Sequence, residues 1–390
     1  MKFTTLLAKI VDKSVFAANT VSLPIVKTQK NIRMLNPADI QPVSGDFTCR
    51  WTSPSNIAIV KYWGKKDGQL PANPSVSFTL DACRTDTSLK VKTREDRNSK
   101  YAVEVYLDGE EKPSFVPKIE QFFDRIAPYA PYLADYAFTV HTSNSFPHSS
   151  GIASSASGMS ALAVCLVDFE NACGADYTPD EFLRRASFYA RLGSGSASRS
   201  IYGGAVAWGE SPAIPGSSNL YAVPLPPENV HPVFRDFRDI VLLVEKGSKS
   251  VSSSAGHALM KGHPFAPARF SQAGEHTAKL LDILRGGEVQ DFGALAESEA
   301  LTLHAMMMTA DPYYILFKPA TLQALQKVWD FRRETGQPLY FTLDAGANVH
   351  LLYPAEAENT IRQFIADELS PLSGGSFIDD RVGTGPRKIG

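Results

Sequence analysis

Two segments rich in serine and glycine could bind phosphate groups. The first covers residues 144–158 and leads directly into an apolar, alanine-rich stretch that predicts a helix. The first turn of a helix offers unpaired N–H groups and a positive dipole end, and small residues let an anion approach closely. The segment has neither the Walker A pattern nor the Rossmann glycine pattern. It therefore predicts an anion site of another kind, and the alternative is a small-residue helix packed tightly against a neighbour.

The second segment, residues 193–200, combines four serines with Arg199. A guanidinium group can grip two carboxylate or phosphate oxygens at once, and hydroxyl groups add further donors. A flexible linker is the alternative. The segment lies between a well-capped predicted helix and the apolar run 205–208, which favours a folded anion site over a linker.

Two isolated charges stand in or directly after apolar runs. Lys61 lies within the run 56–64, and a buried ammonium group without a partner would cost several kcal/mol, so a carboxylate or phosphate partner is implied. The alternative is a lysine whose head group reaches solvent at the end of a strand. Asp344 follows the apolar run 339–343 and precedes a glycine turn, where it could face a cleft or simply form the turn.

The elements that must position these residues are mixed along the chain. Hydrophobic periodicity and capping signals predict strands and helices without strict strand–helix–strand alternation, which favours an α+β fold over a doubly wound parallel sheet. Strands 88–92 and 101–107 have the alternation of half-buried antiparallel strands. The predicted strands are 56–64, 76–80, 88–92, 101–107, 136–142, 240–244, 339–343 and 349–353, and the predicted helices are 117–126, 155–172, 179–191, 266–284, 293–308, 320–335 and 357–369.

The length of 390 residues predicts two domains. Proline, serine and glycine are frequent between residues 208 and 235, which places the boundary there. We expect a poorly ordered extension at 1–45, an N-terminal domain at 46–225 and a C-terminal domain at 226–390. A transit peptide or an upstream start codon would also explain the extension, which is basic and has only short apolar stretches.

The composition excludes several classes of protein. Hydrophobic residues make up 44% and charged residues 21% of the chain, which excludes a disordered, collagenous or coiled-coil protein. The 39 basic and 41 acidic residues nearly cancel, so neither nucleic acid nor a membrane surface is expected as a partner. No run approaches the roughly 18 apolar residues of a membrane span. The four cysteines have no metal-type spacing, which fits a cytoplasmic protein.

Several segments together resemble the diphosphomevalonate decarboxylases of the GHMP kinase superfamily, and most of all a bacterial branch. The segments 61–65, Lys-Tyr-Trp-Gly-Lys, and 193–200, Gly-Ser-Gly-Ser-Ala-Ser-Arg-Ser, separate decarboxylases from the sibling kinases. The resemblance implies the GHMP kinase fold, with a ribosomal protein S5-like N-terminal domain and a ferredoxin-like α/β sandwich as the C-terminal domain, and it implies a homodimer. The remaining matching segments are 53–60, 73–80, 147–157, 253–256 and 344–348.

The resemblance also implies a reaction. ATP phosphorylates the 3-hydroxyl of mevalonate 5-diphosphate, and loss of phosphate and CO2 then gives isopentenyl diphosphate, in the mevalonate pathway of isoprenoid biosynthesis. By similarity, Asp344 orients or deprotonates the hydroxyl, Lys61 pairs with Asp344, and Arg199 holds the substrate carboxylate. The other implied contacts are Tyr62, Lys65, Ser194 and Ser196 to the substrate diphosphate, Ser253 near the transferring group, and Ser149, Gly151, Ala153, Ser154, Ser155 and Ser157 to ATP, with Mg2+ held mainly by ATP phosphates and by Ser155.

One departure from the family leaves alternatives open. Some members have Arg where Ser254 stands and Met where His257 stands, so one diphosphate contact is missing or is replaced by His257 or Lys249. A decarboxylase of mevalonate 5-phosphate and a mevalonate 3-kinase are the alternatives within the superfamily. A non-catalytic GHMP-fold protein that binds a metabolite is the alternative from another class.

Overall fold

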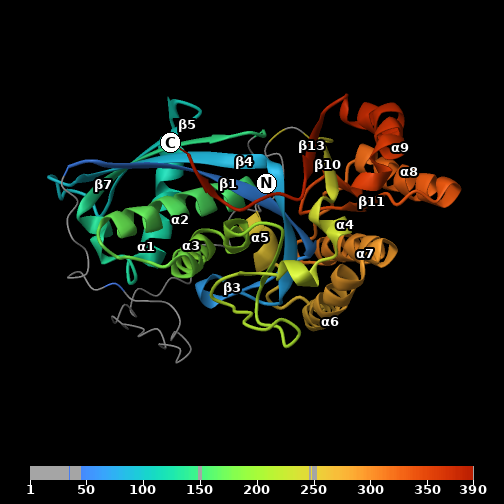
Figure 1. The fold of residues 1–390 in the computed structure, drawn as a ribbon, viewed down its shortest axis with the longest axis horizontal. Helices are drawn as coiled ribbons and strands as arrows, with labels where there is room; N and C mark the ends of the chain where they lie inside the picture. The colour runs from blue at the N-terminus through green and yellow to red at the C-terminus, as the bar shows by residue number, and fades with distance from the viewer. Residues whose placement is uncertain (1–34, 36–44, 148–151, 246, 248–252, 390) are drawn as a thin grey trace, which may run out of the picture. The chain divides into compact units, whose positions relative to one another are not determined.

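The computed structural model describes residues 35, 45–147, 152–245, 247 and 253–389, and all of these lie in one compact unit, Met34–Gly390 (Figure 1). Most of the predicted extension at 1–45 lies outside the described residues. The strands form a larger sheet, a smaller sheet and a short hairpin. The larger sheet contains β1 (Phe47–Val60), β4 (Ser75–Thr93), β5 (Ala102–Leu107), β6 (Glu110–Glu111), β7 (Tyr136–Asn144), β8 (Ala205–Trp208), β9 (Val223–Pro224) and β14 (Arg387–Lys388).

Strand β4 is the longest strand described and corrects the prediction of two separate strands at 76–80 and 88–92. It pairs antiparallel with β1 along most of its length, with register shifts between Pro54 and Asn56 and between Ala58 and Val60. Main-chain N–H groups of Asp81, Ala82 and Cys83 donate to the Asp380 carboxylate. These bonds explain how the strand passes through a stretch whose sequence resembles a turn.

Strand β5 corrects a second expectation. It pairs parallel with β7, with Ala102 opposite Ala137. Parallel neighbours require a crossover connection, and helix α1 (Val116–Ile126) lies in that connection. The alternation of residues along 101–107 was compatible with either direction, so the sequence pattern alone did not determine it.

Helices cover one face of the larger sheet. Figure 1 shows α1, α2 (Ser154–Ala172) and α3 (Pro179–Gly193) together below β1, β4 and β7, and α2 packs against β1 and β4. Helix α3 begins with the predicted capping box, in which the Thr178 side chain accepts from Glu181 N and the Glu181 side chain accepts from Thr178 N. The segment Gly195–Ile201, which follows α3, forms a buried 3-10 helix, so it is not a flexible linker.

The smaller sheet has the order β11 (Tyr340–Thr342), β12 (Val349–Tyr353), β10 (Arg238–Leu242) and β13 (Phe377–Arg381), all antiparallel. The predicted helices of this part are present, and 357–369 divides into α9 (Glu358–Phe364) and a π-helical segment at Ile365–Leu369. The short hairpin contains β2 (Lys65–Lys66) and β3 (Leu70–Pro71). The remaining helices are α4 (Pro232–Arg235), α5 (Ser253–Ala258), α6 (Ala266–Gly286), α7 (Val289–Met308), α8 (Pro319–Thr335) and α9 (Glu358–Phe364).

The C-terminal residues return to the larger sheet. Strand β14 pairs with β1, and Lys388 Nζ lies 2.8 Å from an oxygen of Asp168 on α2. The Arg84 guanidinium, which is almost fully buried, donates to the carbonyl oxygens of Thr384 and Gly385. Neither β13 nor β14 was predicted, because their short polar sequences carry no strand pattern.

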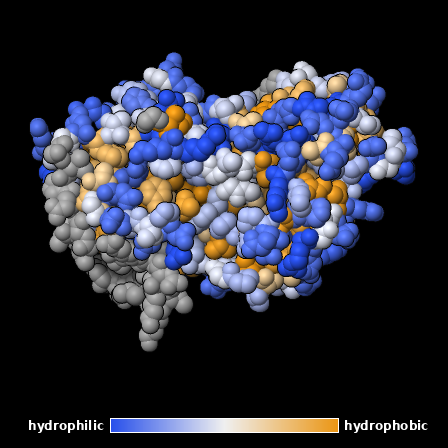
Figure 2. Space-filling model, viewed as in Figure 1, coloured by the Kyte–Doolittle hydropathy of each residue, from blue (hydrophilic) through white to orange (hydrophobic). Residues whose placement is uncertain are grey.

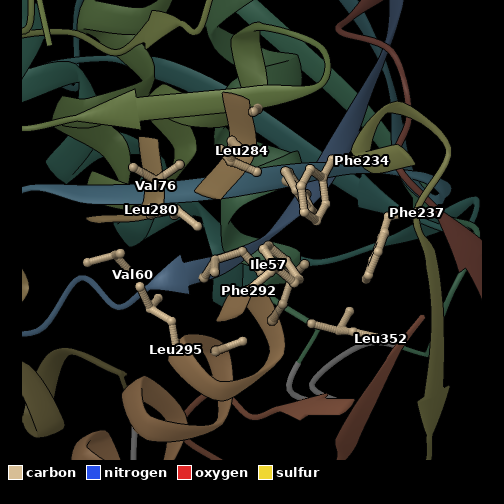
Figure 3. Packing of buried hydrophobic residues seen from close by; sticks show 14 of the residues in the cluster. Ile57, Val60, Val76, Phe234, Phe237, Leu280, Leu284, Phe292, Leu295 and Leu352 are labelled. Atoms are coloured by element: carbon tan, nitrogen blue, oxygen red, sulfur yellow. The ribbon is translucent and has the colours of Figure 1, made fainter. Parts of the chain in front are cut away.

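One hydrophobic core joins residues from both halves of the chain. Figure 3 shows Ile57 and Val76, two residues of the larger sheet, in the same cluster as Phe234, Phe292 and Leu352 from the second half of the chain. This core contains residues on both sides of the predicted domain boundary near residue 225. The position of that boundary stays a prediction. On the face drawn in Figure 2, hydrophobic residues are interspersed among hydrophilic ones. Within the described residues, no helix is both long and apolar enough to cross a bilayer.

Candidate active site

A cavity of about 570 Å3 brings most of the predicted site residues together. Its walls come from the end of β1 and the residues after it, the start of α2, the 3-10 helix at Gly195–Ile201, α1, α5 and the turn after β11. A volume of this size suits a small-molecule site. The predicted residues that line it are Lys61, Tyr62, Lys65, Ala153, Ser154, Ser155, Ser194, Ser196, Arg199 and Asp344.

Lys61 and Asp344, the reactive pair, come from opposite ends of the chain. The Lys61 Nζ atom lies 3.1 Å from Asp344 Oδ1. The Lys61 side chain is 2% exposed and that of Asp344 is 29% exposed, so the carboxylate also reaches the cavity. Burial lowers the pKa of Lys61, and the Asp344 carboxylate opposes that change. The predicted partner of the buried lysine is therefore present.

Arg199 carries a buried positive charge beside this pair. Its guanidinium donates to neutral acceptors, which are Ser75 Oγ at 2.7 Å, Ser77 Oγ at 3.0 Å and Asn56 Oδ1 at 3.2 Å. It forms no ion pair with any carboxylate among the described residues. Burial lowers the pKa of Arg199 to about 10, so the group stays charged at neutral pH. A buried cation held only by neutral groups favours an anionic ligand.

The two serine-rich segments meet at the cavity. Helix α2 begins at Ser154, and its N-cap residue, Ala153, has left-handed backbone angles (φ 44°, ψ 39°) and makes no side-chain cap. The N–H groups of the first turn therefore have no side-chain acceptor at the N-cap position, as an anion site requires. The hydroxyl oxygens of Ser155 and Ser194 are 3.4 Å apart.

One predicted ATP contact does not reach the cavity. Ser157 is fully buried, and its hydroxyl group accepts from Thr85 Oγ1 at 2.6 Å and donates to Ser154 O at 3.3 Å. Its structural role is to fix the first turn of α2 against β4. Ser149, Gly151 and Lys249 lie outside the described residues, and the side chains of Ser253 and Ser254 lie outside them as well.

Three neutral side chains that carry hydrogen-bond donors, His257, Tyr62 and Trp63, are among the residues that line the cavity. His257 Nδ1 accepts from Gly64 N at 3.0 Å, so the ring carries its hydrogen on Nε2. Burial, with added repulsion from Lys65 and Arg199, keeps the pKa of His257 well below its ordinary value, and the ring is neutral. The Tyr62 hydroxyl and Trp63 Nε1 are buried without a hydrogen-bond partner among the described residues, and both rings lie within 5 Å of the His257 ring, with centroid distances of 4.3 and 4.7 Å.

A basic cluster of Lys65, Lys118 and Arg125 lines another part of the cavity. None of the three forms an ion pair with a described residue. Burial, together with repulsion from Arg125 and Lys118, lowers the pKa of Lys65 to about 8. Sequence reasoning missed Lys118 and Arg125, because charged residues on an amphipathic helix usually face solvent. Their spacing of seven residues, which places both on one face of α1, was the available signal.

The oxygen atoms at the cavity suit a magnesium ion that is held mainly by the phosphates of a nucleotide. The described residues contain no group of three or more His, Cys, Asp or Glu side chains arranged to hold a metal ion. Mg2+ is commonly held by one or two protein oxygens together with substrate phosphates. The Asp344 carboxylate and the Ser155 hydroxyl at the cavity are oxygens of this kind.

Comparisons with known proteins show which proteins this chain resembles. Residues 53–219 match the family model described as the diphosphomevalonate decarboxylase-like N-terminal domain. Diphosphomevalonate decarboxylase from Bos taurus is 30% identical over 349 residues, which cover 82% of this chain and 78% of that protein. Diphosphomevalonate decarboxylase from Aspergillus fumigatus is 28% identical over 342 residues, which cover 83% of this chain and 81% of that protein.

The chain belongs to the diphosphomevalonate decarboxylase family. Among solved structures, mevalonate diphosphate decarboxylase from Staphylococcus aureus superposes with a TM-score of 0.75 at 28% identity, covering 88% of this chain and 98% of that one. A structure described as MDDEF in complex with MVAPP, AMPPCP and magnesium superposes with a TM-score of 0.74 at 26% identity, covering 88% of this chain and 99% of that one. The α+β GHMP kinase fold is therefore confirmed. Relatives are both eukaryotic and bacterial, so the bacterial branch stays a prediction.

Proposed function

We propose that this chain catalyses the ATP-dependent decarboxylation of mevalonate 5-diphosphate to isopentenyl diphosphate, with ADP, phosphate and CO2 as the other products. The observation that carries the proposal is the Lys61–Asp344 pair, which shares one cavity with Arg199 and with the start of α2. Membership of the family and the complex of a related structure with MVAPP, AMPPCP and magnesium support the same reaction.

Asp344 would act on the 3-hydroxyl of the substrate. Its carboxylate lines the cavity and is partly exposed there, so it is placed to accept the hydroxyl proton. The Lys61 ammonium group pairs with the carboxylate and adds positive charge next to the oxygen that receives the phosphoryl group. Phosphate then leaves with the electrons of its C–O bond. The electrons of the C–C bond to the departing CO2 form the new carbon–carbon double bond.

Arg199 would bind the carboxylate that is lost. Because its guanidinium is fixed by Ser75, Ser77 and Asn56, it can hold that group without a large loss of side-chain entropy. The ATP phosphates would lie at the start of α2, with Ser154 and Ser155 as donors and Mg2+ held by those phosphates and by Ser155. The diphosphate would contact Tyr62, Lys65, Ser194 and Ser196, with Ser253 near the transferring group.

The test is a product balance. Purified protein with ATP, Mg2+ and mevalonate 5-diphosphate should release CO2 and ADP in equal amounts. ADP without CO2 would instead identify a 3-kinase. Nucleotide or substrate binding without either product would identify a metabolite-binding protein.

His257 bears on the choice between a mono- and a diphosphate substrate. It offers a neutral Nε2–H donor next to Tyr62 and Lys65, where a further phosphate would need one. We expect His257→Met, which keeps the size but removes the donor, to raise the Kd for mevalonate 5-diphosphate about tenfold and that for mevalonate 5-phosphate much less. Titration calorimetry on both ligands measures this, and tighter binding of the monophosphate by wild type would favour the monophosphate decarboxylase.

We also propose that the protein is a homodimer and lies in the cytoplasm. The family resemblance supports a homodimer, which sedimentation at several concentrations would test. All four cysteines, Cys49, Cys83, Cys165 and Cys173, are buried and free, as is usual in a reducing cytoplasm.

A further inference from the structure

Helix α7 contacts the main chain of both members of the reactive pair. Glu299 Oε2 accepts a hydrogen bond from Lys61 N at 2.8 Å. His304, five residues further along the same helix, lies with Nε2 3.1 Å from Asp344 O. Neither Glu299 nor His304 lines the cavity, so neither is placed to touch substrate.

The contact with Lys61 supplies partners that the sheet does not provide. Strand β1 ends at Val60, and Lys61 is therefore the first residue beyond the strand. Glu299 accepts from its N–H group, and Arg269 Nη2 on α6 donates to its carbonyl oxygen at 3.2 Å. Arg269 and Glu299 are fully buried and form a bidentate ion pair with bonds of 2.5 and 2.9 Å.

Glu299 stays ionised in this buried position. Burial alone would raise its pKa, but hydrogen bonds from His276 and Arg269 and the Arg269 charge hold the pKa of Glu299 below its ordinary value. A charged acceptor binds a main-chain N–H group more strongly than a neutral one. The main chain of Lys61 is thus held from both sides by residues of α6 and α7.

The contact with Asp344 is fixed by the tautomer of His304. A carbonyl oxygen can only accept, so His304 Nε2 carries the hydrogen and donates. Burial lowers the pKa of His304 to about 4, and the ring therefore stays neutral at physiological pH. The ring also stacks on Phe317, with centroids 4.1 Å apart and planes 12° apart, which fixes its orientation.

Helix α7 is itself tightly fixed to the strand that leads to Asp344. A Cβ atom placed on Gly293 would lie 1.9 Å from a carbon of the Tyr340 ring. Only glycine therefore allows α7 to approach β11 this closely. The helix has a defined position relative to β11, and its next turns reach Lys61 and Asp344.

We propose that Glu299 and His304 are positioning residues which set the separation of Lys61 from Asp344 through the main chain of each. The inference rests on the proposed function, because it assigns the rate of that reaction to the geometry of this pair. A displacement of about 1 Å in a reacting group can cost about 100-fold in rate. Loss of either contact should therefore lower kcat and leave KM nearly unchanged.

His304→Phe is the main variant, because phenylalanine keeps the ring stacked on Phe317 and removes the donor. We expect kcat to fall about 10- to 100-fold, with KM for both substrates within about twofold. In His304→Gln, the side-chain amide can occupy the position of Nε2 and donate to Asp344 O, so most of the lost activity should return. A role in packing alone would not predict this rescue.

His263 provides a matched control. Its Nδ1 accepts from Phe265 N, and its Nε2 donates to Met306 O at 3.1 Å, the same bond at the same length and also buried. The acceptor is on α7, two residues from His304, but it belongs to neither member of the reactive pair. His263→Phe should lower the Tm about as much as His304→Phe and should leave kcat within about twofold of wild type.

A double-mutant cycle with Asp344→Asn separates the possible outcomes. If His304 acts through Asp344, His304→Phe should change kcat little once Asp344 is asparagine. Wild-type kcat in His304→Phe, or equal losses of kcat in His304→Phe and His263→Phe, would overturn the inference. Absence of CO2 release by the wild-type protein would instead overturn the proposed function. If His304→Phe does not fold, His304→Gln and His304→Asn give the same comparison, because asparagine is too short to reach Asp344 O.

Discussion

Two groups of cations line the cavity, and they are held in different ways. The buried cations, Lys61 and Arg199, are almost inaccessible to solvent, and their side chains donate to other side chains of the protein. The basic cluster of Lys65, Lys118 and Arg125 is half-buried or exposed and has no carboxylate partner among the described residues.

The difference separates two tasks of the site. Buried charges in fixed positions act strongly on a reacting group because little solvent screens them. Exposed cations that repel one another attract a multiply charged anion and are screened by salt. We expect the buried cations to control kcat and the basic cluster to control KM.

The largest expected effect is that of Asp344→Asn. Asparagine keeps the shape of the side chain but can neither accept the proton nor balance the charge of Lys61, so kcat should fall about 1,000-fold. Steady-state CO2 release measures the loss. Asp330→Asn, an equivalent change on the surface of α8, should leave kcat unchanged. Turnover of Asp344→Asn within a few-fold of wild type would show that Asp344 is not the group that acts on the hydroxyl.

A second effect concerns the stability of the protein as a function of pH. The pKa of His304 is about 4 in the folded protein and 6.5 for the ordinary group, so the unfolded state binds more protons between these values. The free energy of unfolding should therefore fall as pH drops from 6.5 towards 4, by about 3 kcal/mol for this group. Urea unfolding at several pH values measures it. His304→Gln should flatten the dependence, and His141→Gln, at an exposed side chain, should not.

Changes in the basic cluster should have smaller effects, mainly on binding. Lys118→Gln and Arg125→Gln should each raise the KM for the phosphorylated substrate about tenfold at low salt while kcat stays within twofold. The increase should shrink as ionic strength rises. Lys112→Gln, an exposed lysine just before α1, is the control. A loss of kcat with unchanged KM would mean that the basic cluster takes part in the reaction itself.

The smallest effect is a pH dependence of substrate capture. Lys65 has a pKa of about 8, so it loses its positive charge as pH rises through 8, and kcat/KM should fall several-fold above that value. Lys65→Arg should move the fall to higher pH, because the guanidinium group remains charged. A pH profile of kcat/KM that is the same for both proteins would exclude Lys65 as the titrating group.

The sequence predicted Lys61, Arg199 and Asp344 better than it predicted the basic cluster. A lysine inside an apolar run and an aspartate at the end of another are unusual enough to stand out, and the resemblance to the family supplied their pairing. Lys118 and Arg125 are ordinary residues of an amphipathic helix, and only the path of the chain shows that their face lines a cavity. The role of Glu299 could not be predicted for a related reason. Nothing local in the sequence identifies a glutamate that binds the main chain of Lys61, which is 238 residues away.

The fold was predictable where periodicity was strong. The long helices agree with their predicted ranges to within a few residues, because apolar spacing and caps are local signals. The continuity of β4 depends on Asp380, and the parallel direction of β5 depends on the crossover through α1. Both arise from contacts between distant parts of the chain, which local patterns do not encode.

The separation of Lys61 from Asp344 by 283 residues has a consequence for the growing chain. At about 5–20 residues per second, the ribosome needs roughly 15–60 s to make the partner of Lys61 after the lysine itself. During that interval a folded N-terminal half would have to bury an unpaired ammonium group, so we expect the end of β1 to stay open until the later segments emerge. Protease cleavage of stalled nascent chains near residue 61, lost only once residue 344 has left the ribosome, would reveal this delay.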